Sequence, residues 1–206
     1  MIKKFLILLL IFVSFSSKIS YALVEVDITR GNLDPLPIAV SPLFVQKNNL
    51  KNAEFKEIGA KISEVIEGNF KRSGLFNPLS KESFVQEPEI AHLKPRFEDW
   101  KLIKAQALVT GKIELENEKL RVEFRLWDIV AAKEILALAF TTVPDNWRRV
   151  AHIISDKVYQ RLTGEKGYFD TRIIYVSEKG PKNARIKKLA IMDQDGSNNK
   201  YLTLGN

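Results

Sequence analysis

The sequence predicts an α/β fold. We expect an N-terminal mixed β-sheet packed against two long amphipathic helices, followed by the beginning of an all-β propeller, about one blade. Apolar residues recur at helical spacing in residues 54–73 and 147–162, and alternating strands lie between these stretches. After residue 171 no helical pattern remains, and short strands follow one another at even spacing. These observations predict one mixed domain and one purely β unit.

Residues 1–22 have the pattern of a secretory signal peptide. Two lysines precede an apolar run from Phe5 to Phe15, and Ser20-Tyr21-Ala22 places small residues at a cleavage site. The run is shorter than the roughly 20 apolar residues that span a bilayer, although an uncleaved anchor is the alternative. We expect cleavage between Ala22 and Leu23, with no lipid anchor and a mature protein outside the cytoplasm.

Composition excludes several classes of function. The 206 residues include no cysteine, which rules out disulfides and thiol catalysis. Loss of the three lysines of the signal peptide lowers the formal net charge from +7 to +4, a mild bias. No basic stripe is interleaved with aromatic residues, so we expect no nucleic-acid binding.

The mature chain begins with a short two-faced strand, LVEVDIT, at Leu23–Thr29. Val24, Val26 and Ile28 alternate there with polar residues. This strand has two possible uses: it pairs within its own domain, or it adds to the sheet edge of a partner through main-chain hydrogen bonds.

The first half of the mixed domain follows a turn-rich break. In order we expect a strand at Ile38–Val45, a helix at Glu54–Ser73, an edge strand at Leu75–Leu79, a loop over 80–96 and a short helix at Phe97–Ile103. The apolar stripe of the longer helix consists of Phe55, Ile58, Ile62, Val65, Ile66 and Phe70. Gly74 is placed to end this helix in the left-handed conformation.

The second half of the domain predicts a β-meander and a helix. The strands are expected at Ala107–Ile113, Leu120–Leu126 and Glu134–Val143. We expect Asp145 to cap a helix that Gly164 terminates. The apolar face of this helix consists of Trp147, Ala151, Ile154, Val158 and Leu162.

The C-terminal region predicts strands at Arg172–Ser177, Ile186–Met192 and Tyr201–Leu204. An isolated hairpin is marginally stable in water. We therefore expect residues 166–206 to pack poorly in this chain, with fast amide exchange from about Arg172.

The sequence offers little sign of catalytic chemistry. We expect His92 to be a solvated surface residue in a polar loop and His152 to be packed beside a helix stripe; neither has metal-ligand spacing, and we expect no metal and no cofactor. Asp193, Asp195 and Asn198 resemble part of a calcium loop, but Gly196 comes too early and no closing Glu follows. A hairpin turn with positive φ at Asp-Gly is the simpler interpretation.

Basic residues near the C-terminal end have two interpretations, a solvated strand face or a binding surface. They are Lys179, Lys182, Arg185, Lys187 and Lys188.

Several stretches resemble the TolB family, periplasmic components of the Tol-Pal system. The resemblance runs from Val24 to Thr203. It rests on PIAVSPL, RSGLFNPL, ALVTGKIE, RLWDI, AHIISDKVYQRLTGEKGYFDTRIIYVS and IMDQDGSNNKYLT.

The resemblance implies a domain organisation and a division of contacts. It implies a signal peptide at 1–22, a TolA-binding segment at 23–34, an α/β domain at 35–164, and a linker with an incomplete first propeller blade at 165–206. The contacts with the TolA C-terminal domain would come from Leu23, Val24, Glu25, Val26, Asp27, Ile28 and Thr29. The Pal lipoprotein would bind mainly through further blades, and the protein would meet membranes only through its partners.

The resemblance also implies the function. A non-enzymatic, periplasmic protein would link TolA and Pal, maintain outer-membrane integrity and constrict that membrane during division. Two alternatives remain open at this point: the N-terminal portion of a propeller-containing exported serine peptidase, and a free-standing outer-membrane assembly module with a disordered tail.

Overall fold

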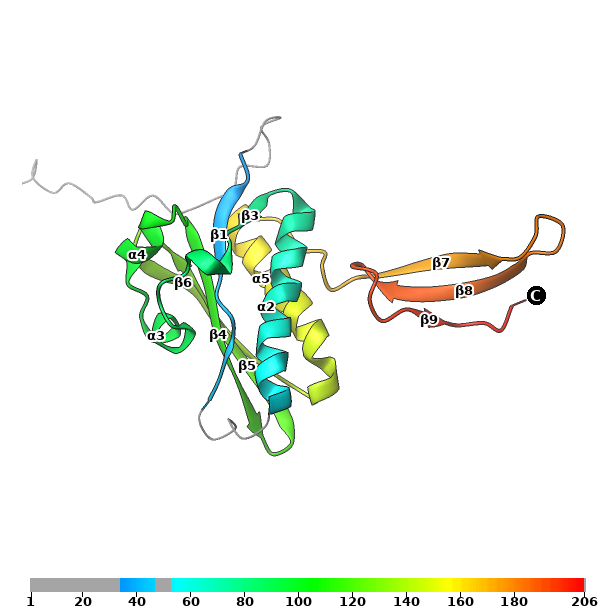
Figure 1. Ribbon diagram of the computed structural model, residues 1–206, viewed down its shortest axis with the longest axis horizontal. Helices are drawn as coiled ribbons and strands as arrows, with labels where there is room; N and C mark the ends of the chain where they lie inside the picture. Colours follow the sequence, from blue (N-terminus) through cyan, green and yellow to red (C-terminus); the bar gives the residue numbers. More distant parts are fainter. Residues whose placement is uncertain (1–33, 47–52, 206) are drawn as a thin grey trace, which may run out of the picture.

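The computed structural model describes residues 34–46 and 53–205 of the chain (Figure 1). The predicted signal peptide and the LVEVDIT strand lie outside the described residues. Side chains are described from residue 57 onward in the first helix.

A mixed sheet forms the centre of the N-terminal domain, as predicted. Its strand order is β3-β1-β4-β5-β6, and a short strand β2 also pairs with β4. The strands are β1 (Leu36–Val40), β2 (Phe44–Val45), β3 (Phe76–Pro78), β4 (Ala107–Glu116), β5 (Lys119–Asp128) and β6 (Lys133–Thr142). β1 runs parallel to β3 and β4, whereas β4, β5 and β6 form an antiparallel meander.

Two helices lie side by side on one face of this sheet (Figure 1). They are α2 (Ala53–Ser73) and α5 (Trp147–Thr163). The described members of the predicted stripe in α2, from Ile58 to Phe70, are buried, as are Ile154, Val158 and Leu162 of α5. Burial of these apolar side chains against the sheet provides the main driving force for folding.

Both predicted glycine helix ends are confirmed. Gly74 and Gly164 have φ of 71° and 78°, the left-handed conformation that glycine adopts without a Cβ penalty. The predicted cap at Asp145 is wrong. Asp145 lies in a 3₁₀ turn, η3 (Pro144–Asn146), and Asn146 occupies the cap position, because Pro144 initiates a tight turn before the α-helix begins.

The predicted loop over residues 80–96 is wrong in part. It contains a 3₁₀ turn, η2 (Lys81–Ser83), and the helix α3 (Pro88–Leu93), in which Pro88 occupies the first helical turn that proline tolerates. The predicted short helix follows as α4 (Phe97–Leu102). A second apolar cluster packs α3 and α4 onto the sheet. It includes Ala91, Trp100, Leu108, Trp127 and Ile129.

Gln86 organises this second cluster. Its Oε1 accepts hydrogen bonds from the Trp100 ring nitrogen and from the Arg96 backbone N–H, both at 3.0 Å. Its amide nitrogen donates to the Lys94 carbonyl. One buried polar side chain thus holds together a segment that the sequence predicts to be a loop.

The C-terminal region forms a three-stranded antiparallel sheet. Its strands are β7 (Arg172–Lys179), β8 (Ile186–Asp193) and β9 (Lys200–Tyr201), in the order β7-β8-β9. Figure 1 shows this sheet extending away from the helices with one end near them. Large apolar side chains are exposed along it, among them Ile174, Val176 and Ile186.

The segment that joins the two parts is firmly packed. Phe169 is fully buried in the main core. Asp156 of α5 accepts hydrogen bonds from the backbone N–H groups of Phe169 and Asp170. The prediction of loose packing from residue 166 onward is therefore wrong for this linker, because α5 supplies both an apolar pocket and a carboxylate for it.

Candidate functional site

The residues predicted for partner binding, Leu23–Thr29, and the predicted cleavage site between Ala22 and Leu23 lie outside the described residues. The structure therefore leaves their role as a prediction. Within residues 34–46 and 53–205 no helix is long and apolar enough to cross a membrane.

His92 is buried, which contradicts the predicted solvated position. Only 2% of its surface is exposed, and its ring meets Phe44 edge-on with centroids 5.5 Å apart. Burial, assisted by the nearby Arg125 charge, lowers the pKa of His92 from 6.5 to about 4. The residue is buried because α3, not predicted from the sequence, carries it onto the sheet.

A hollow of about 210 Å³ lies beside His92. Lys112 and Arg125 line it, but Lys112 pairs with Glu123 at 3.4 Å and Arg125 pairs with Glu134 at 3.4 Å. Each cation in the lining of the hollow therefore already has an acidic partner.

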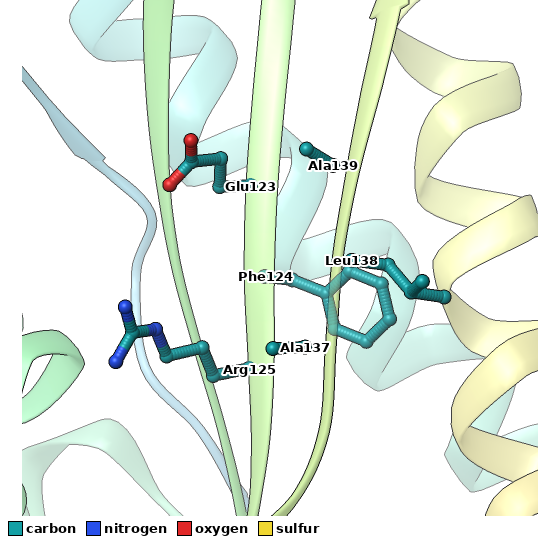
Figure 2. A pocket seen from close by; sticks show the side chains of 6 residues that line it. All are labelled: Glu123, Phe124, Arg125, Ala137, Leu138 and Ala139. Carbon is teal, nitrogen blue, oxygen red and sulfur yellow. The ribbon is translucent and has the colours of Figure 1, made fainter.

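A second hollow, of about 220 Å³, lies over β5 and β6 (Figure 2). Glu123 and Arg125 point to one side of the sheet there, and Phe124 and Leu138 point to the other. The small side chains of β6 at this point leave a shallow depression on an edge strand.

A cluster of polar side chains joins α2, α5 and the β8–β9 turn. Arg148 of α5 pairs with Asp195 of the turn, whose side chain is 3% exposed. Gln194 of the turn donates a hydrogen bond to Asn69 of α2 at 2.8 Å. His152 of α5 lies between these contacts, 2% exposed, as its predicted packed role requires. We call this set of five residues the joint.

Electrostatics in the joint follow from burial and from its ion pair. Burial lowers the pKa of His152, although the Asp195 charge opposes this effect. Burial by itself raises the pKa of Asp195, but hydrogen bonds from the Ser197 N–H and from Arg148 hold it below its ordinary value of 3.8. Near neutral pH the joint therefore contains a neutral imidazole beside an ionised carboxylate.

The predicted Asp-Gly turn is confirmed only in part. Gly196 has a φ of 84°, and its N–H bonds the Asp193 carbonyl at 2.9 Å. The connection is a longer loop than a two-residue primed turn. The reason is that Asp195 is turned towards Arg148 and the Asn198 side chain bonds the Asp193 carboxylate.

The C-terminal basic residues fall on exposed strand and turn positions. Arg185 and Lys187 both pair with Glu178 across the sheet. Lys188 lies over the Tyr201 ring, 5.2 Å from its centroid. These contacts are those of a solvated strand face.

Sequence reasoning missed Asn69, Arg148 and Gln194 as members of the joint. Each occupies an ordinary polar position, and the contact between Asn69 and Gln194 spans 125 residues. Of the residues singled out from the sequence, only His152 and the Asp193–Asn198 motif lie in or beside the joint.

The fold and the joint define a class of protein. It has a mixed α/β domain with an antiparallel β unit docked on its helices, and the polar side chains that gather in the described residues connect elements to one another.

The chain belongs to the TolB family. The family model described as the TolB amino-terminal domain matches residues 24–135. A curated relative, a Tol-Pal system protein TolB of Pelagibacter ubique (strain HTCC1062), is 66% identical over 210 residues. That match covers 100% of this chain and 46% of the relative, so the chain spans about half of that relative's length.

A solved structure shows the same fold. The crystal structure of TolB from Acinetobacter baumannii matches with a TM-score of 0.63 at 24% identity, covering 82% of this chain and 39% of that one. The mixed α/β architecture is thus shared with a TolB.

Proposed function

We propose that this protein is a non-catalytic, periplasmic component of the Tol-Pal system that links TolA to the lipoprotein Pal. The observation that carries the proposal is the 66% identity to a Tol-Pal system protein along the entire chain. In this role it would help to maintain outer-membrane integrity and to constrict the outer membrane during division. The family assignment favours this function over the exported-peptidase alternative.

The division of the chain follows from the same proposal. A signal peptide at 1–22 directs export, residues 23–34 bind TolA, residues 35–164 form the α/β domain, and residues 165–206 begin a propeller. The exposed apolar side chains of β7 and β8 support the last assignment, because a propeller blade packs its faces against neighbouring blades.

The N-terminal segment is the proposed TolA contact. Its alternating pattern at Leu23–Thr29 suits an extended strand that adds to a partner's sheet edge. We propose a competition in which the segment either lies against its own protein or is released to TolA. Pal bound on the propeller would bias this equilibrium, which requires that Pal bind the two states with different affinity.

Deletion of residues 23–34 tests the TolA contact. The shortened protein should lose binding to the TolA C-terminal domain in calorimetry and keep the circular dichroism and melting temperature of the parent. Undiminished affinity in the deletion would contradict the proposal.

Proline substitution tests the strand-addition mode. The N–H groups of Val26 and Asp27 point to opposite sides of an extended strand, and proline removes the donor. Either Val26→Pro or Asp27→Pro should weaken TolA binding by about tenfold, the equivalent of one or two main-chain hydrogen bonds. The control Val26→Thr keeps the N–H and should bind within about threefold of the parent. Parental affinity in both proline variants would exclude main-chain pairing.

A further inference from the structure

The amide of Asn69 has its orientation fixed by four partners. Its Oδ1 accepts from Arg72 at 2.6 Å and from Gln194 at 2.8 Å, so the oxygen must face these two donors. Its Nδ2 therefore faces His152 Nδ1 at 3.0 Å and Ser155 Oγ at 2.8 Å. The Ser155 hydroxyl donates its own proton to a backbone carbonyl and can only accept from Asn69.

This orientation determines the tautomer of His152. Since Asn69 Nδ2 is a donor, His152 Nδ1 must present its lone pair, and the ring proton lies on Nε2. That Nε2 is buried without a hydrogen-bond partner and lies 3.6 Å from Asp195 Oδ2. The imidazole thus accepts a hydrogen bond from α2 and directs its N–H towards the β8–β9 turn.

The same hydrogen-bond arrangement around His152 argues against a metal at this position. His152, Asp193 and Asp195 bring potential ligand atoms within 4.8 Å of one another. A metal ligand needs a free lone pair, but His152 Nε2 carries a proton and Asp195 already binds Arg148 and the Ser197 N–H. The cluster is better suited to respond to protons.

We propose that the joint is proton-sensitive: it holds the β8–β9 turn, and with it the near end of the β7–β8–β9 sheet, on α2 and α5 while His152 is neutral, and it releases the turn when His152 is protonated. This inference goes beyond the proposed function, because it concerns the connection between the two parts of the chain whatever partners they bind.

Protonation acts through Asn69. The second proton must enter at His152 Nδ1, where Asn69 Nδ2 already points a donor. Two donors cannot face each other, so the amide must turn, and its oxygen then leaves Gln194 and Arg72. The only direct hydrogen bond between α2 and the turn described here is the one from Gln194, so that link is lost.

The charges around His152 set the direction of the response. Arg148 on α5 opposes protonation, whereas Asp195 of the turn, Asp193 at the end of β8 and Asp170 of the linker favour it. Burial outweighs these attractions, and the pKa of docked His152 lies below 6.5. An undocked His152 regains water and a pKa near 6.5. Docking is therefore fully favoured above pH 6.5 and weakens as the pH falls below it.

Linkage determines the sign of the effect. The ratio of docked to undocked protein falls as the pH is lowered from about 7.5 to about 5, because undocked His152 takes up a proton more readily than docked His152. Asp195 stays ionised throughout, because its pKa lies below 3.8.

Distance measurement between two spin labels tests the proposal. The sequence has no cysteine, so Lys71→Cys on α2 and Lys182→Cys in the β7–β8 turn provide unique labels at exposed positions. In the full 206-residue chain we expect one narrow distance at about pH 7.5 and a broadened or shifted distribution at about pH 5. Circular dichroism at both pH values shows whether the domain remains folded.

The chain has only two histidines, which gives a matched pair of variants. His92→Gln should keep the pH-dependent broadening, whereas His152→Gln should give the same distribution at both pH values. Broadening that persists in His152→Gln, or a distance that stays narrow in the parent at the lower pH, overturns the proposal.

Nitrogen chemical shifts test the predicted tautomer of His152 independently of docking. At about pH 7.5 the His152 ring should show an unprotonated Nδ1 and a protonated Nε2. Ring nitrogens with the opposite protonation would overturn the proposed route through Asn69.

Discussion

The side-chain oxygen of Asn69 in α2 accepts a hydrogen bond from Gln194, 125 residues later in the chain, at 2.8 Å. The same oxygen accepts from Arg72, and the amide nitrogen donates to His152 and Ser155. One buried side chain thus saturates its hydrogen-bonding capacity between two helices and a turn. A fully satisfied buried network of this kind fixes a single arrangement of the elements that it joins.

Removal of Asn69 should be costly. Asn69→Ala leaves His152, Ser155 and Gln194 without the partner that the amide supplied, and unpaired buried groups cost about 1–3 kcal/mol each. Because water can reach some of these groups in the variant, we expect a total loss of about 2–4 kcal/mol in urea unfolding.

Gln194→Ala is the matched control, since it removes one of the four contacts from the exposed side of the network. It should cost about 1 kcal/mol. Equal losses in the two variants would mean that the contacts of the Asn69 amide with Arg72, His152 and Ser155 add little to stability.

The sequence was sufficient for the elements whose burial is periodic. The stripes of α2 and α5 and the alternation from Leu120 to Leu126 depend on neighbours in the same element. The structure buries the described residues of each as expected, except that Trp147 is only partly buried. The two glycine helix ends are equally local, since each follows from a backbone preference.

Long-range polar contacts were not predictable in this way. Gln86 holds the α3 segment in place by bonding residues eight to fourteen positions away. In the sequence, however, nothing distinguishes Gln86 from a glutamine in a loop. The sequence therefore predicts a surface position for His92, which the structure buries. The sequence does not predict the joint either, because no periodic pattern relates Asn69 to a turn near the other end of the chain.

His92 should make stability depend on pH. Its folded pKa of about 4 lies below the ordinary 6.5, because burial disfavours the charged ring. Its contribution is complete above pH 6.5 and is lost as the pH falls from 6.5 towards 4. Urea midpoints of the parent should decline over this range.

His92→Leu removes the titrating group and places an apolar side chain next to Phe44. Its urea midpoint should decline less between pH 6.5 and pH 4 than that of the parent. A parallel decline in both proteins would assign the pH dependence to carboxylates instead.

Two glycines in α2 should respond in opposite ways to alanine. A Cβ at Gly59 would lie 2.3 Å from the Leu43 carbonyl oxygen, so Gly59→Ala must displace backbone and should destabilise by about 2 kcal/mol or more. A Cβ at Gly68 would meet only the end of the Arg72 side chain, at 3.3 Å. Gly68→Ala should therefore gain up to about 1 kcal/mol from helix propensity, as measured by thermal unfolding. The same sign for both variants would contradict this distinction.

Neighbouring arginines of α5 offer a comparison between a buried and an exposed ion pair. Arg148 pairs with Asp195 with side chains 23% and 3% exposed, and Arg149 pairs with Asp170 with side chains 63% and 29% exposed. Arg148→Met leaves a buried carboxylate without its cation and should cost about 2–3 kcal/mol, somewhat less than a fully buried pair because water can enter. Arg149→Met leaves the Asp170 carboxylate exposed to solvent and should cost under about 1 kcal/mol.

Methionine keeps most of the aliphatic stem in both variants, so the difference in urea midpoint reports the effect of the charge. Similar losses in the two variants would show that the Arg148–Asp195 contact is solvated in solution, and docking of the β8–β9 turn would then have to rest on Gln194 alone.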